Sequence, residues 1–191
     1  MEQADETRRV LRHFLAALAY RTQKAVRGAP PEFADFSAGA GARTPRELAR
    51  HMASVLGYAR TFFIGGVYRA EPLESFEAEI ERFHANAAEL AEHLRRGTPL
   101  RGITLDQLLQ GPFSDAMTHA GQIAMLRRLA GSPVASENFI FAEVSADRLG
   151  SDQAPPAAPD PAWMGRVVPW AWRIARLQAR LAQRWRRRTP S

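Results

Sequence analysis

Apolar residues in one segment of the chain recur at alternating spacings of four and three residues. They are Phe76, Ile80, Phe83, Ala87, Leu90 and Leu94. This spacing puts the side chains on a single stripe of a helix, and such a stripe is typical of a helix packed inside a bundle. The segment therefore predicts a helix from about residue 73 to 96, ended by Gly97 and Pro99.

Three further segments show a helical apolar period, over about residues 5–26, 45–64 and 112–130. The second has the clearest start signal, because Thr44 suits the N-cap, Pro45 the first helical position and Glu47 the capping box. A short helical turn capped by Thr104 is expected over residues 104–110. The sequence predicts an all-α fold built as a four-helix bundle.

The chain of 191 residues is long enough for one domain with a core and short for two. It contains no cysteine, which excludes disulfides, cysteine-ligated zinc and a cysteine nucleophile. A polar N-terminus and the lack of an apolar run near 18 residues predict a cytoplasmic protein.

The net charge of +6 belongs to the C-terminal end of the chain. Eight arginines and no acidic residue follow Trp163, and without them 18 basic residues face 20 acidic ones. We expect a Pro-rich strap and an amphipathic, Arg-rich helix over residues 151–191. That helix either docks by its Trp/Leu face, or uses residues 163–188 to contact an anionic membrane, nucleic acid or a partner.

Three polar residues share one stripe of the helix predicted over residues 112–130. Asp115, His119 and Gln122 align there with Leu126 and Leu129, so the stripe is expected to face the core. A carboxylate and an imidazole one turn apart can hold one divalent cation. The alternative is that Asp115 and His119 hydrogen-bond each other or lie at a wet helix end.

A second imidazole, His51, lies on the inner side of the helix predicted over residues 45–64. If this helix runs parallel to the helix over residues 112–130, His51 comes to the level of Asp115 and His119. Two imidazoles and one carboxylate then form a facial ligand set with open positions for water or substrate. The alternative interpretation of His51 is a packed core histidine.

These stretches resemble the DinB/YfiT-like superfamily of metal-binding four-helix bundles. The resemblance covers about residues 5–150, and the stretches that carry it are Leu48-Ala-Arg-His51-Met, Asp115-x-x-x-His119-Ala-Gly-Gln122-Ile and Glu137-Asn138-Phe139. It implies an up-down-down-up bundle over residues 1–150, a divalent metal such as zinc, nickel or iron, and a homodimer. The chain departs from the family at Asp115, where histidine is usual, and aspartate can ligate the same ions.

The resemblance implies a metal site of His51, Asp115 and His119, with Gln122 and Asn138 lining the pocket or orienting a ligand. The alternative role of Gln122 and Asn138 is a structural hydrogen bond. The expected activity is that of a metal-dependent hydrolase or thiol S-transferase on a small molecule. A low-molecular-weight thiol would have to come from outside the chain, because the chain has no cysteine. The alternatives are a non-catalytic metal- or ligand-binding bundle with a degenerate site, and surface association through residues 163–188.

Overall fold

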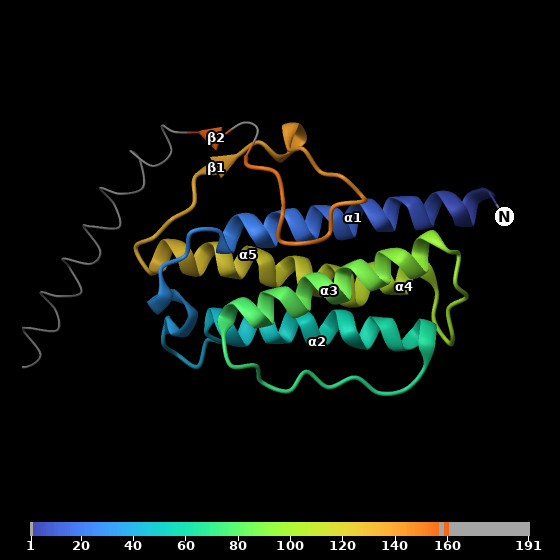
Figure 1. Cartoon of the computed structure of the whole chain (residues 1–191), viewed down its shortest axis with the longest axis horizontal. Helices are drawn as coiled ribbons and strands as arrows, with labels where there is room; N and C mark the ends of the chain where they lie inside the picture. The colour runs from blue at the N-terminus through green and yellow to red at the C-terminus, as the bar shows by residue number, and fades with distance from the viewer. Residues whose placement is uncertain (1, 157–158, 161–191) are drawn as a thin grey trace, which may run out of the picture.

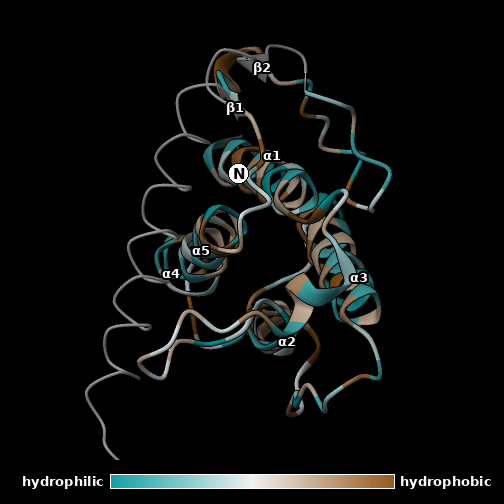
Figure 2. Ribbon diagram, turned by 90° about the vertical axis from the view of Figure 1, so that its left-hand side faces the viewer, coloured by the Kyte–Doolittle hydropathy of each residue, from teal (hydrophilic) through white to brown (hydrophobic). Residues whose placement is uncertain are grey.

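Four long helices pack side by side in the computed structural model, which describes residues 2–156 and 159–160 (Figure 1). They are α1 (Glu2–Val26), α2 (Pro45–Ile64), α3 (Phe76–Arg95) and α5 (Ser114–Leu129). Seen along their length they occupy four corners, and each packs against two others: α1 and α2 each contact α3 and α5 (Figure 2). The all-α prediction is confirmed for the described residues. The helix expected over residues 163–188 lies outside them.

The four long helices run in two opposite directions. In Figure 1, α1 and α5 run one way while α2 and α3 run the other. The helices that carry His51 and Asp115 therefore run antiparallel, so the condition under which the sequence placed these residues at one level is not met. The residues still meet because the helical path toward α5 begins at Leu105, nine residues before α5 itself. Asp115 thus lies well along that path and comes level with the second turn of α2.

The entry into α5 is a continuous helical path through a proline. Thr104 caps α4 (Leu105–Leu108), and a π-helical turn, η2 (Leu109–Phe113), then joins α4 to α5 with Pro112 inside it. Proline has no N–H for the usual α-helical bond, and a π turn accommodates that loss. The Ser114 hydroxyl donates to the Leu109 carbonyl at 2.6 Å. Gly111-Pro112 therefore lies within the helical path and does not begin it.

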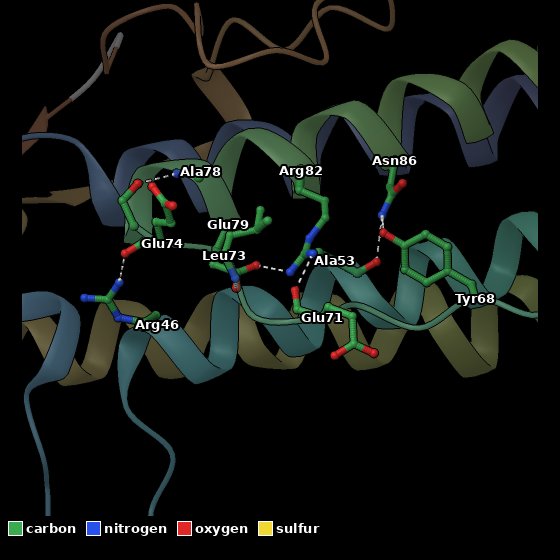
Figure 3. Close-up of polar contacts among 11 residues, drawn as sticks. Arg46, Ala53, Tyr68, Glu71, Leu73, Glu74, Ala78, Glu79, Arg82 and Asn86 are labelled. Atoms are coloured by element: carbon green, nitrogen blue, oxygen red, sulfur yellow. Dashed lines mark hydrogen bonds and ion pairs between the residues drawn. The ribbon is translucent and has the colours of Figure 1, made fainter.

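The long connection between α2 and α3 lets these two helices run in the same direction. Side chains of α3 fasten it, as Figure 3 shows: Glu79 accepts from the Leu73 N–H at 2.9 Å, and Arg82 donates to the Glu71 carbonyl at 2.7 Å. Asn86 donates to the Tyr68 hydroxyl at 2.9 Å. The connection is thus part of the packed structure.

Helix boundaries follow the capping signals of the sequence. Thr44 and Glu47 form the predicted capping box, and Gly65 ends α2 with a φ of 82°. The third helix begins at Phe76, later than expected, because the Ser75 side chain accepts from the Ala78 N–H and acts as the N-cap.

The core lies between the four helices and consists of apolar side chains from all of them. The α5 residues that face it most directly are Ala116, Ala120 and Ile123, which are small or aliphatic and allow α1 to pack closely. The predicted stripe therefore lies at the edge of the buried face. Leu129, expected in the core, is 57% exposed.

The remaining elements are short. They are the 3₁₀ turns η1 (Pro31–Asp35) and η3 (Phe139–Phe141), and the strands β1 (Ser136–Glu137) and β2 (Pro159–Asp160), which pair antiparallel. Among the helices of the described part, none combines the length and apolar content needed to cross a bilayer.

Candidate metal centre

Two helices bring three potential metal ligands together. His51 lies on the second turn of α2, and Asp115 and His119 lie on the first two turns of α5. One ligand atom from each lies within 4.8 Å of those of the other two. The two imidazole rings are 4.7 Å apart between centroids and nearly perpendicular, at 80°. The packing of α2 on α5 therefore assembles the set that the sequence predicts.

The Asp115 carboxylate lies between the two imidazoles. Its Oδ1 is 3.3 Å from His119 Nε2, and its Oδ2 is 3.5 Å from His51 Nε2. Both separations exceed the 2.7–2.9 Å or so of a good charge-assisted hydrogen bond. Direct pairing of Asp115 with the histidines is thus loose, whereas a cation between the three groups would contact donors from all of them.

Gln122 fixes the orientation of one imidazole. Its Oε1 is 2.8 Å from His119 Nδ1, so it accepts a hydrogen bond when Nδ1 carries the proton. In that tautomer the unprotonated Nε2 faces Asp115 and is free to donate a lone pair to a metal ion. A metal-ligating histidine commonly has such a partner on its other nitrogen.

The three side chains differ in their exposure to solvent. His119 is 10% exposed, His51 31% and Asp115 48%. The expectation that Asp115 is buried on an inward face is wrong, because the stripe lies at the edge of the buried face. The desolvation of the carboxylate therefore does not by itself demand a metal. Asp115 is the most exposed of the three side chains, so a small molecule can approach the site from its side.

The electrostatic surroundings favour neutral His51. Burial lowers its pKa most, and the charge interactions with Arg43 and His119 act in the same direction. The Asp115 carboxylate opposes them. A neutral imidazole is the form that ligates a metal. The donor set, two imidazole nitrogens and one carboxylate oxygen, is one that divalent zinc, nickel and iron accept.

The segment after α5 lies against α1, and none of its described contacts joins it to His51, Asp115 or His119. Asn138, predicted to line the pocket, accepts from the Ile140 N–H at 3.2 Å and caps η3. Two acidic residues of this segment, Glu143 and Asp147, pair away from the centre. Glu143 pairs with Arg148 and Asp147 with Arg12.

Sequence reasoning assigned no role to His84, which the structure buries. Its Nδ1 lies 2.7 Å from the Leu149 carbonyl oxygen and its Nε2 3.2 Å from Gln23 Oε1. The available signal was its position four residues after Ile80, which places it on the apolar face of α3.

Comparison of the chain with protein-family models, with curated proteins and with solved structures finds no match in any of the three. The geometry of the site therefore carries the functional argument.

Proposed function

We propose that this chain is a divalent-metal-dependent protein of the DinB/YfiT-like type, with His51, Asp115 and His119 as the ligands. The observation that carries the proposal is the meeting of three ligand atoms from α2 and α5 within 4.8 Å of one another. The helix directions in Figure 1 support the up-down-down-up order that this family has. The family's homodimer, and a cytoplasmic location, are part of the same proposal.

The proposed activity is that of a hydrolase or a thiol S-transferase acting on a small molecule. A divalent ion supplies a Lewis acid that polarises an oxygen atom or stabilises a thiolate. Gln122 holds the His119 ring in one tautomer, and the half-exposed Asp115 leaves one side of the site accessible. A thiol cosubstrate must be a low-molecular-weight compound, because the chain has no cysteine.

A second candidate function is a non-catalytic metal- or ligand-binding bundle. The observation that favours it is the pairing of Glu143 and Asp147 with arginines, because it leaves neither of these two carboxylates at the site as a general base. The enzyme and the binding protein share the metal site but differ in turnover. Association with a membrane or nucleic acid through residues 163–188 is a third possibility, and it concerns residues outside those described.

Metal analysis of the full chain after metal-supplemented purification tests the proposal. We expect about one ion per chain in the wild type, and less than about a tenth in His51→Ala and His119→Ala. His13→Ala is the matched control, because His13 is exposed on α1 and contributes nothing to the site. A wild-type content below about a tenth of an ion per chain would contradict the proposal.

A further inference from the structure

A cavity of about 230 Å³ lies on a different face of α5 from the metal centre. Its walls come from α1, α5 and residues 134–139, and they include Lys24, Met117, Ala120, Gly121 and Glu137. The wall is thus partly apolar and also carries the ammonium group of Lys24 and the carboxylate of Glu137. A hollow with an apolar surface and a few polar groups has the general character of a small-molecule site.

Lys24 is the single lysine among the 26 basic residues of the chain. Its side chain is 11% exposed, and its Nζ donates to the Ala135 carbonyl at 2.6 Å and lies 3.6 Å from Glu137 Oε2. The Tyr20 hydroxyl donates to the other Glu137 oxygen at 2.6 Å. An arginine is charged at any physiological pH, whereas a buried lysine can lose its proton and act as a nucleophile.

The surroundings of Lys24 lower its pKa from the ordinary value of a lysine. Burial lowers its pKa most, and the charges of Arg128 and Arg21 act in the same direction, while Glu137 opposes them. Arg21 and Arg128 also line the cavity. A lysine desolvated beside other cations is a recognised form of activated amine nucleophile.

Gly121 lines the cavity and, having no side chain, leaves space in it. It lies in the interior of α5, where glycine costs about 1 kcal/mol relative to alanine. No described atom outside its own helix lies within 4 Å of the position that a Cβ would occupy. Close packing therefore does not require glycine here, and a larger side chain at this position would enter the cavity.

We propose that this cavity is a second ligand site, in which the Lys24 amine forms an imine with a small aldehyde or ketone, preferentially an anionic one. The amine adds to the carbonyl carbon. The carbonyl oxygen then leaves as water with the two hydrogens lost by the nitrogen, and a C=N bond replaces the C=O bond. Arg21 and Arg128 supply the positive charge that favours an anionic compound such as a 2-oxo acid.

Reductive trapping on the full-length protein tests this proposal. Glyoxylate and cyanoborohydride are added at pH 7, and the modified peptide is quantified by mass spectrometry. The control is the double variant Lys24→Arg/Arg69→Lys, which moves the one lysine to an exposed position in the connection between α2 and α3. We expect wild-type Lys24 to be labelled several-fold faster than the control amine, because burial lowers the pKa of Lys24 and the cavity can hold the aldehyde beside it. Equal or slower labelling would overturn the proposal and leave Lys24 as an anchor for residues 134–139.

A second variant keeps the lysine and closes the cavity. Gly121→Leu is tolerated by the helix and fills the space, so labelling of Lys24 should fall several-fold while the thermal unfolding temperature is maintained. Labelling that is unaffected would show that the cavity is not the route to the amine. A neutral aldehyde of similar size should react more slowly than glyoxylate, and an equal rate would contradict the preference for anions.

This site is independent of the metal proposal. Labelling should be the same in His119→Ala and in the presence of a chelator, because Met117, Ala120 and Gly121 face the cavity while His119 faces α2. Loss of metal binding with labelling retained would contradict only the metal centre. Loss of labelling in His119→Ala would contradict the independence of the two sites.

Discussion

Two polar clusters on α5 have opposite character. Near the end of the helix, Arg127 is only 4% exposed, and its guanidinium donates to backbone carbonyls at the end of α1 and to Ser132. Near the start, Asp115 and His119 lie with His51 at separations too long for good hydrogen bonds, and Asp115 is half-exposed.

The difference separates a structural cluster from one that can take a ligand. Arg127 donates to the carbonyl of Ala25 in the last turn of α1 and to the carbonyls of Arg27 and Gly28, which follow that helix. Its guanidinium makes five hydrogen bonds, four of them to main-chain carbonyls, so the cluster is closed. The three residues of the metal centre have donor atoms that converge without satisfying one another. A convergent and partly open set is what a bound ion requires.

Arg127→Ala should have the largest effect on stability. Several carbonyls at the end of α1 would lose their donor in a buried place, so we expect the free energy of unfolding to fall by about 3 kcal/mol. Denaturant unfolding monitored by circular dichroism measures this. Arg69→Ala, at an exposed position, should change stability by less than about 0.5 kcal/mol. A similar small change in Arg127→Ala would contradict the structural assignment of this cluster.

Gln122→Ala should weaken metal binding without removing a ligand. The His119 ring would lose the acceptor that fixes its tautomer, and the affinity for zinc should fall about 10–100-fold. Competition with a chromophoric chelator measures the change. Gln107→Ala, away from the centre at the α4 capping box, serves as the control. Unchanged affinity in Gln122→Ala would show that the hydrogen bond does not serve the metal centre.

His84 is buried like Arg127, but its imidazole can gain or lose a proton near neutral pH. Burial lowers its pKa from 6.5, although the Leu149 carbonyl and the Asp152 charge oppose this shift. The unfolded state therefore binds the proton more readily. The contribution of neutral His84 to stability is complete above about pH 6.5 and is lost as the pH falls through the lowered pKa. His84→Gln should show a smaller loss of stability between pH 7 and 5 than the wild type, and an equal loss would contradict this assignment.

Asp115→Asn should have the smallest effect on the metal-free protein. The carboxylate is half-exposed and loosely paired, so we expect a change in unfolding free energy below about 0.5 kcal/mol. The same variant should lose metal-induced stabilisation, which for the wild type is about 2.7 kcal/mol at a zinc concentration of 100 times Kd. A large loss of stability in the metal-free protein would show that Asp115, like Arg127, has a structural role, and would contradict this prediction.

Local signals in the sequence account for most of what could be predicted. The capping box at Thr44 and Glu47 and the apolar stripe of α3 depend on neighbouring residues, and the structure confirms both. His51, Asp115 and His119 were identified from residue type and spacing, and the structure brings them together.

Features that depend on packing could not be predicted in the same way. The stripe through Asp115 and Leu129 lies at the edge of the buried face of α5. The centre of that face carries Ala116 and Ala120, which are buried in the core. The helical path through Pro112 depends on a π turn that no local signal specifies. The role of Arg127 depends on the end of α1, which is about a hundred residues away in the sequence.

Isothermal titration of zinc into the metal-free full chain measures how many ions α2 and α5 hold and how tightly. We expect one site per chain. We expect its affinity to be lowered more than about 100-fold by each of His51→Ala, Asp115→Ala and His119→Ala, a larger loss than removal of an orienting residue causes. His13→Ala should bind zinc as the wild type does. Binding that is unchanged in all three variants, or absent in the folded wild type, would contradict the claim that α2 and α5 together hold one cation.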